Sequence, residues 1–118
     1  AIGLLGLAGL QATALSFNST AYQRSQATNL AYDIIDRMRA NAAAARSGQY
    51  DVGFGFANPG TSTLANRDLG EWRQALINAL PSGTGSIART GNVFTIVVQW
   101  DDSRGQDALR TFQTDTDL

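Results

Sequence analysis

The sequence predicts an α+β protein, in which a long N-terminal α-helix packs by its C-terminal half on a small antiparallel β-sheet head. Three observations predict this fold. Residues 1–45 contain no proline, and apolar residues recur there at helical spacing. A shorter helical pattern follows at residues 69–80, and strand-like alternation then flanks a turn at residues 90–92. We expect a stalk helix over residues 1–45, with an apolar half over residues 1–17 that projects, and a globular head over residues 46–118 that forms one domain with the second half of the helix.

The first part of the helix is too long and too apolar to pack on the head alone. A helix over residues 2–45 would be about 65 Å long, whereas a head of about 73 residues is about 30 Å across. The projecting apolar surface therefore needs a membrane or other helices. The apolar residues 1–10 follow neither a methionine nor a basic segment, so we expect further residues upstream of them. Ten helical residues cover about half of a bilayer, so we expect this segment to be the second half of a membrane span. The expected assembly interface consists of the large apolar side chains of this half: Ile2, Leu4, Leu5, Leu7, Leu10, Leu15 and Phe17.

The second part of the helix is amphipathic. Its apolar stripe includes Leu30, Ile34 and Met38, which follow one another at four-residue spacing. The opposite face carries two acid-before-base pairs, Asp33 with Arg37 and Asp36 with Arg39. These charges form either a solvated face or an ionic docking patch.

The head begins with a connection over residues 47–67, which is rich in glycine, asparagine, serine and threonine. Its aromatic residues indicate either a loop pinned to the head or a partner surface. Asp68 and Glu71 have the spacing of a capping box, which predicts that a helix opens at Leu69 and ends at Leu80 before Pro81. We expect Leu69, Trp72, Leu76 and Leu80 to share its buried face.

The rest of the chain predicts an antiparallel sheet of about three strands, at residues 86–89, 93–100 and 108–114. Alternate residues of the middle strand are large and apolar, so this set should face the helix stripe. The expected helix-to-sheet core consists of Leu30, Ile34, Met38, Phe94, Ile96, Val98 and Trp100.

The composition excludes much of enzyme chemistry. The 118 residues contain no cysteine and no histidine, so disulfides, thiolate or imidazole metal sites and histidine-activated nucleophiles are excluded. A net charge of −1 argues against nucleic acid as the main partner. We expect no catalytic residue, no cofactor and no small-molecule substrate.

Two local motifs have alternative interpretations. Residues 83–88 match the G-x-G-x-x-A form of a dinucleotide loop, but they follow a predicted helix and open a strand, which is the wrong context. Asp101, Asp102 and Asp107 could offer oxygen ligands to calcium, or they could be solvated loop charges.

Several segments together resemble the V-type minor pilins of type IV pili, also called type IV pilus modification proteins. The resemblance is carried by the string at residues 2–14, by Asp36-Arg37-Met38-Arg39-Ala40-Asn41, and by residues 22–27, 31–33, 68–73, 80–81 and 94–102. It implies a type IV pilin-like fold and a non-enzymatic subunit of the tip complex that primes pilus assembly. The cysteines common in such heads are absent here.

The resemblance also implies partners and a location. The apolar helix would lie in the inner membrane of a Gram-negative bacterium, with the head in the periplasm, and then in the fibre or its tip. Its partners would be other minor pilins, the major pilin and, as a candidate, a tip adhesin, with roles in adhesion and twitching motility. The alternative in the same class is an I-type pseudopilin of a type II secretion system. A DNA-uptake pilin and a membrane-anchored enzyme are the rivals from other classes.

Overall fold

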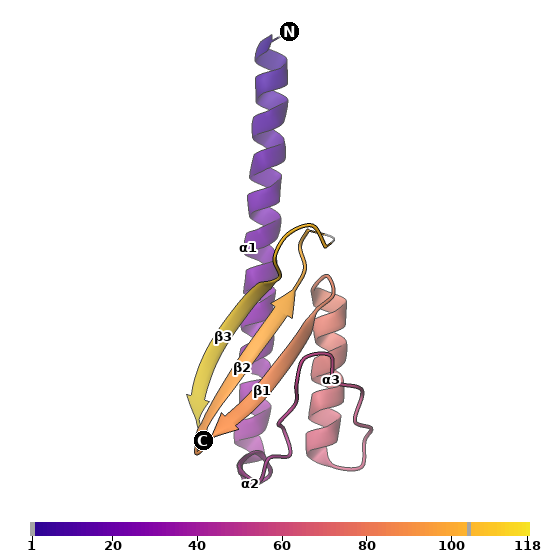
Figure 1. Ribbon diagram of the computed structural model, residues 1–118, viewed down its shortest axis with the longest axis vertical. Helices are drawn as coiled ribbons and strands as arrows, with labels where there is room; N and C mark the ends of the chain where they lie inside the picture. Colours follow the sequence, from indigo (N-terminus) through magenta and orange to yellow (C-terminus); the bar gives the residue numbers. More distant parts are fainter. Residues whose placement is uncertain (1, 104) are drawn as a thin grey trace.

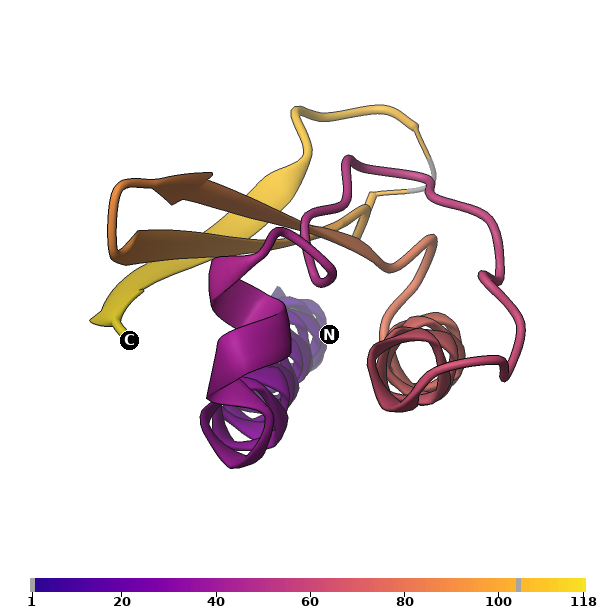
Figure 2. The same cartoon turned by 90° about the horizontal axis from the view of Figure 1, so that it is seen from below.

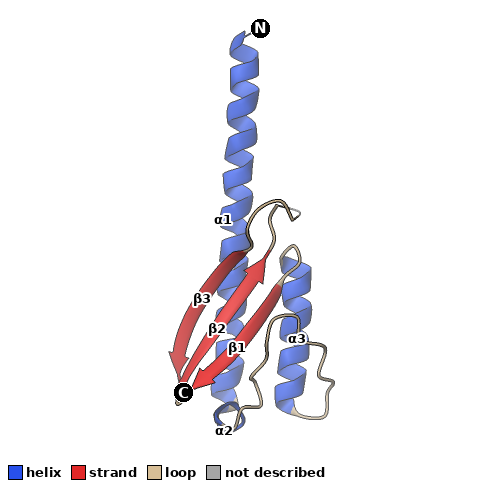
Figure 3. Ribbon diagram, viewed as in Figure 1, coloured by secondary structure: helices blue, strands red, loops and turns tan. Residues whose placement is uncertain are grey.

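A computed structural model describes the backbone of residues 2–103 and 105–118 and the side chains of residues 20–103 and 105–118. Its elements, in chain order, are α1 (Ile2–Ala40), α2 (Ala42–Arg46), α3 (Leu64–Ala79), β1 (Thr84–Thr90), β2 (Val93–Trp100) and β3 (Arg110–Asp117). The molecule measures 65 × 26 × 21 Å, and α1 runs along nearly all of its length (Figure 1). The predicted α+β fold, a long helix packed on a small antiparallel sheet, is confirmed (Figure 3).

The long helix is interrupted near its C-terminal end. Asn41 has φ −134° and ψ 47°, outside the helical region, and it separates α1 from the five-residue α2. The expected uninterrupted helix to Ala45 is therefore wrong at this point. The side-chain amide of Asn41 donates a hydrogen bond to the hydroxyl of Tyr50, which holds the break against the following loop.

The three strands form one antiparallel sheet in the order β1-β2-β3. β1 and β2 are joined by a tight turn in which Gly91 has a φ of 62°, a conformation that suits glycine. β3 pairs with the whole of β2, from Trp100 opposite Arg110 to Val93 opposite Asp117. The predicted last strand at residues 108–114 is therefore displaced. Its polar end continues as a strand because β2 offers hydrogen-bonding partners along its full length.

The short helix begins earlier than predicted. The N-cap is Thr63, whose hydroxyl accepts a hydrogen bond from the backbone N–H of Asn66 at 3.0 Å. The capping box assigned to Asp68 and Glu71 is wrong, because both residues lie inside α3. The connection is correspondingly shorter than expected, and the first strand is longer, since it begins at Thr84.

The core lies between the sheet and the two longer helices, which cover the same face of the sheet (Figure 2). Leu30 is partly buried and packs against the core cluster. Full burial, with an exposed fraction of 0%, is found for six residues at the helix–sheet contact: Ile34, Met38, Phe94, Ile96, Val98 and Trp100. The inner face of α3 adds the four apolar residues Leu69, Trp72, Leu76 and Leu80 to the same core.

The two glycines that begin the dinucleotide-loop lookalike have a packing role. A Cβ at Gly83 would lie 2.2 Å from the carbonyl oxygen of Leu76, and a Cβ at Gly85 would lie 2.4 Å from the indole ring of Trp72. Such distances are below van der Waals contact, so only glycine lets β1 approach α3 this closely.

Candidate assembly site

The candidate assembly site is the part of α1 that extends beyond the head. Ala27 is the first core residue of α1, the contacts with the head end about residue 23, and the helix projects from there towards Ile2 (Figure 1). The side chains of the predicted assembly interface, from Ile2 to Phe17, lie outside the described residues. Among the side chains that are described, no helix offers a segment long and apolar enough to cross a membrane.

The helix is held at the point where it leaves the head. The guanidinium of Arg24 lies over the ring of Trp100, 5.9 Å from its centroid, in a cation–π contact. The indole N–H of Trp100 and the side-chain oxygen of Gln23 are both buried, and neither has a hydrogen-bond partner among the described residues. The last residue of β2 thus anchors the first turn of α1 that reaches the head.

A second attachment joins α1 to α3. The indole N–H of the fully buried Trp72 donates a 2.9 Å hydrogen bond to the backbone carbonyl of Leu30. The ring of Phe56 stacks on the same indole, with centroids 6.3 Å apart, and thereby brings the connecting loop onto α3.

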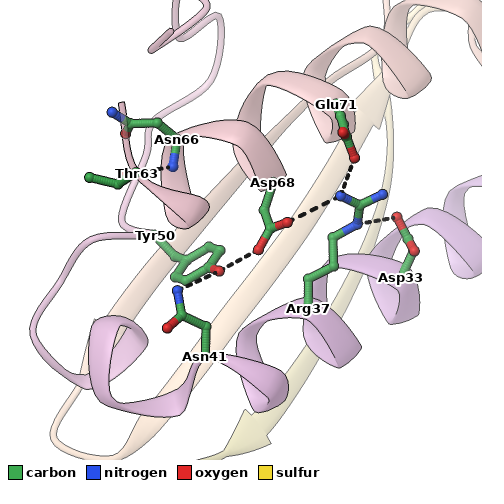
Figure 4. Close-up of polar contacts among 8 residues, drawn as sticks. All are labelled: Asp33, Arg37, Asn41, Tyr50, Thr63, Asn66, Asp68 and Glu71. Atoms are coloured by element: carbon green, nitrogen blue, oxygen red, sulfur yellow. Dashed lines mark hydrogen bonds and ion pairs between the residues drawn. The ribbon is translucent and has the colours of Figure 1, made fainter. Parts of the chain in front are cut away.

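A third attachment is a charged cluster around Arg37 (Figure 4). Its guanidinium contacts three carboxylates: Asp33 of α1 at 3.3 Å, Asp68 of α3 at 3.2 Å and Glu71 of α3 at 2.5 Å. The hydrogen bond to Glu71 raises the pKa of Arg37 above its ordinary value. Three carboxylates around one guanidinium keep it charged and tie α3 to the amphipathic half of α1.

The buried end of this cluster reaches the loop after α2. Asp68 is 7% exposed, and its other carboxylate oxygen accepts a 2.5 Å hydrogen bond from the hydroxyl of Tyr50 (Figure 4). Burial raises the pKa of the Tyr50 hydroxyl to about 12, and the hydrogen bond to Asp68 adds to this effect. The series of side-chain contacts from Asn41 through Tyr50 and Asp68 to Arg37 therefore fixes the helix break, the loop and α3 to one another.

The two predicted ion pairs of α1 are both present. Asp33 pairs with Arg37, and Asp36 pairs with Arg39 at 3.8 Å. Arg37 is directed towards α3, whereas Arg39 donates a hydrogen bond to the hydroxyl of Thr116 in β3 at 3.2 Å. Both guanidiniums therefore connect the helix to other elements of the head.

The acidic loop after β2 has local partners. The carboxylate of Asp101 accepts hydrogen bonds from the backbone N–H and the hydroxyl of Ser103, and the backbone hydrogen bond lowers the pKa of Asp101. Asp102 pairs with Arg110 at 3.2 Å. Within residues 20–103 and 105–118, no three acidic side chains converge in a way that could hold a metal ion.

The sequence contained a signal for the Asp68 network that the capping interpretation missed. Asp68 lies at i+3 from Ala65 and at i−4 from Trp72, both of which are fully buried, so it belongs to the apolar face of α3. A carboxylate on such a face needs a cation or hydrogen-bond donors. Arg37 and Tyr50 supply both, from positions 31 and 18 residues away in the chain.

A single helix that projects from a helix-and-sheet head, and that carries the head on its second half, is the architecture of a type IV pilin. Residues 9–68, half of the chain, match the family model described as Type IV pilin Tt1218. The chain therefore belongs to the Tt1218-like family of type IV pilins. Searches of curated proteins and of solved structures found no match.

Membership of this family makes the chain a structural pilin rather than a member of an enzyme family. Pilins are associated with the pilus at the cell envelope and assemble with other pilins. The matched segment runs from α1 into α3. It contains all four residues of the contact series described above: Arg37, Asn41, Tyr50 and Asp68.

Proposed function

We propose that this pilin is a V-type minor pilin, which acts in the tip complex that primes assembly of a type IV pilus. Before assembly, the N-terminal part of α1 lies in the inner membrane of a Gram-negative bacterium and the head lies in the periplasm. Afterwards the helix packs with the helices of other minor pilins and of the major pilin. The proposal is supported by family membership and by the resemblance of residues 2–14, 36–41 and 68–73 to V-type minor pilins.

The observation that carries the proposal is the length of α1 outside the head. Residues 2–22 of the helix precede Gln23 and Arg24, the first residues that contact the head, and they span about 31 Å at 1.5 Å per residue. The hydrocarbon core of a bilayer is about 30 Å thick. The part of α1 outside the head is therefore long enough to lie in a membrane before assembly and in a bundle of helices afterwards.

The sequence of the projecting helix fits packing between helices. The large apolar residues Ile2, Leu4, Leu5, Leu7, Leu10, Leu15 and Phe17 supply the contact surface. Gly9 and Thr13, and likewise Ala8 and Ala12, are small residues at four-residue spacing, which lets helix backbones approach closely. We assign the assembly interface to this segment.

Deletion of the gene and complementation with the full-length protein tests the proposal. The deletion strain should show few surface fibres and weak twitching, and the wild-type gene should restore both. Complementation with Leu5→Asp should fail, because a carboxylate in the helix bundle is costly. A matched variant, Gln74→Asp, places the same charge on the exposed face of α3 and should complement.

The readouts also separate the alternatives. Loss of protein secretion with normal fibre number would assign the chain to a type II secretion pseudopilus instead. Salt-dependent binding of DNA by the purified protein would favour a DNA-uptake pilin. Normal fibres, secretion and DNA uptake in the deletion strain would contradict a role in any of these assemblies.

A further inference from the structure

A small pocket lies where α3, the connecting loop and the start of β1 meet. It has a volume of about 100 Å³, and its lining includes residues of all three elements: Gly55, Phe56, Arg73, Leu76, Ile77 and Thr84. Pockets for small-molecule ligands measure about 300–1,000 Å³. This pocket is smaller than that range, and its size suits a single side chain from another protein.

Hydrogen bonds between its walls give the pocket a fixed shape. The Nε of Arg73 donates a 2.9 Å hydrogen bond to the carbonyl of Phe56, which ties the loop to α3. The backbone N–H of Gly55 donates a 2.7 Å hydrogen bond to the hydroxyl of Thr84, which ties the loop to β1. The ring of Phe56 also stacks on the buried Trp72. The pocket is therefore preformed, which lowers the ordering cost of binding.

The polar groups of the pocket are hydrogen-bond donors. Apart from its Nε–H, the guanidinium of Arg73 has no acceptor within the described residues, and none of their carboxylates pairs with it. The hydroxyl of Thr84 accepts from Gly55, so its own O–H is available to donate. Arg73 is only partly exposed, and an arginine in such a position is normally paired. A carboxylate matches both the charge and the fork of N–H groups.

The rest of the pocket is apolar. Leu76 is 1% exposed, and Ile77 beside it is 46% exposed. None of the residues that line the pocket is acidic. Apolar walls suit the methylene groups of a short side chain, and the donors suit a carboxylate at its end. An aspartate or glutamate side chain has both parts.

The position of the pocket indicates the source of that side chain. The end of α3 and the start of β1 lie at the end of the head from which the stalk emerges (Figure 1). The stalk continues beyond it for about 31 Å. A pilin that packs along this length, with its own stalk parallel, brings its head next to this end. A side chain in a preformed pocket is the usual form of an interface anchor.

We propose that the pocket beside Arg73 receives an aspartate or glutamate side chain of a neighbouring pilin subunit. The carboxylate accepts hydrogen bonds from the guanidinium of Arg73 and from the hydroxyl of Thr84, and its methylene groups contact Leu76 and Ile77. The inference rests on the proposed function only in requiring a neighbouring subunit in a fibre. It goes further by naming the chemistry of one contact between heads.

A cross-link can test the contact because the sequence contains no lysine; its basic residues are all arginines. The full-length protein with Arg73→Lys is expressed in fibre-forming cells that lack the wild-type gene. Sheared fibres are treated with a carbodiimide, which joins an amine to a carboxylate in direct contact through an amide bond. We expect a linked product of this chain and a second pilin, and mass spectrometry should locate the link at an aspartate or glutamate of that pilin.

The matched control is Arg67→Lys. Arg67 also lies on α3, and it also donates a hydrogen bond to a loop carbonyl, that of Thr61. However, it lines a separate hollow together with the acidic Glu71, so that hollow does not favour a second carboxylate. Arg67→Lys should give about tenfold less intermolecular product than Arg73→Lys. Equal yields, or links only to acidic residues of the same chain, would overturn the proposal.

A competing carboxylate can also be placed in the same chain. Ile77 is four residues after Arg73, so Ile77→Glu directs a carboxylate towards residue 73 from the next turn of α3. Combined with Arg73→Lys, it should lower the intermolecular product about tenfold, whereas the neutral Ile77→Gln should leave the yield unchanged. The unfolding midpoint of each variant is measured to verify that the head is folded. Equal effects of the two substitutions would contradict competition for the pocket.

A titration in solution tests the pocket without fibres. Butyrate is added to the full-length protein in detergent, with butyramide as its neutral counterpart, and the NMR signals of the backbone amides around Thr84 are followed. Butyrate should shift these signals saturably at millimolar concentration, and butyramide should not. Arg73→Gln should abolish the shift, whereas Arg67→Gln should retain it. Equal responses to butyrate and butyramide would overturn the assignment of the pocket to a carboxylate.

The outcomes are separable from those of the proposed function. Absence of the protein from sheared fibres would contradict the proposed function, and the butyrate titration would still decide whether the pocket takes a carboxylate. Presence in fibres without an intermolecular link in Arg73→Lys would overturn the contact between heads and leave the pilin role intact.

Discussion

Replacement of Arg37 by methionine should destabilise the head far more than the same replacement of Arg39. Both arginines lie on α1, and each pairs with an aspartate of its own helix. Methionine keeps most of the apolar stem and removes only the charged group. The two arginines differ in their other partners, because Arg37 also forms an ion pair with Asp68, whose side chain is only 10% exposed.

The magnitude follows from burial. Removing one partner of a fully buried ion pair costs about 3 to 5 kcal/mol, because the remaining charge is left unpaired. The side chain of Arg37 is 30% exposed and Asp68 retains the Tyr50 hydroxyl, so we expect a smaller loss of about 2 to 3 kcal/mol for Arg37→Met. The Arg39–Asp36 pair has side chains 58% and 76% exposed, and Arg39→Met should cost less than about 1 kcal/mol.

The assay is urea unfolding of the full chain in detergent, followed by tryptophan fluorescence, since Trp72 and Trp100 are both buried in the head. A double variant, Arg37→Met with Asp68→Asn, should regain about 1 kcal/mol relative to Arg37→Met, because the buried charge is removed while the Tyr50 hydroxyl keeps an acceptor. Equal destabilisation by Arg37→Met and Arg39→Met, or no recovery in the double variant, would refute this account of the cluster.

Three further outcomes are expected. Folding raises the pKa of Tyr50 from 10 to about 12, so the unfolded chain loses this proton first as the pH rises. The free energy of unfolding should therefore fall by about 2 kcal/mol between pH 10 and 12. Tyr50→Phe should remove that part of the pH dependence, as measured by urea titrations. Gly85→Ala should destabilise by about 1 to 3 kcal/mol through its clash with Trp72, whereas Gly53→Ala, with open space around its Cβ position, should change the unfolding midpoint little. Ile34→Ala should cost about 2 to 5 kcal/mol by leaving a cavity in a fully buried position, as measured by thermal unfolding.

The sequence predicts those features whose signal is local. The period of apolar residues in α1 identifies the helix and its buried stripe, and the alternation in β2 identifies the central strand, because both patterns reflect one buried face. β3 is a weaker case. Its residues from Thr114 onward alternate threonine with aspartate, which carries no apolar signal, and only pairing with β2 makes them a strand.

The polar network could not be predicted because its members are distant in sequence. Asp68 three residues before Glu71 is a valid capping pattern, and the competing cap at Thr63 differs from it only in the residue that accepts the backbone hydrogen bond. The role of Asp68 is decided by its tertiary position, because it lies on α3 opposite Arg37 of α1. No local pattern records that α3 packs beside that turn of α1.

The attachments of the head to α1 make the head and its half of the helix one rigid unit. Three contacts join β2 and α3 to points of one helix that are nearly two turns apart: Arg24 with Trp100, the Leu30 carbonyl with Trp72, and Arg37 with Asp68. A helix is stiff over such a distance, and the attached elements share one close-packed core. Rotation of α1 within a bundle must therefore rotate β2 and α3 by the same angle. Packing of the stalks would then fix which surfaces of neighbouring heads face one another, and loosening Arg37 should disturb the position of α3 while insertion of the stalk remains intact.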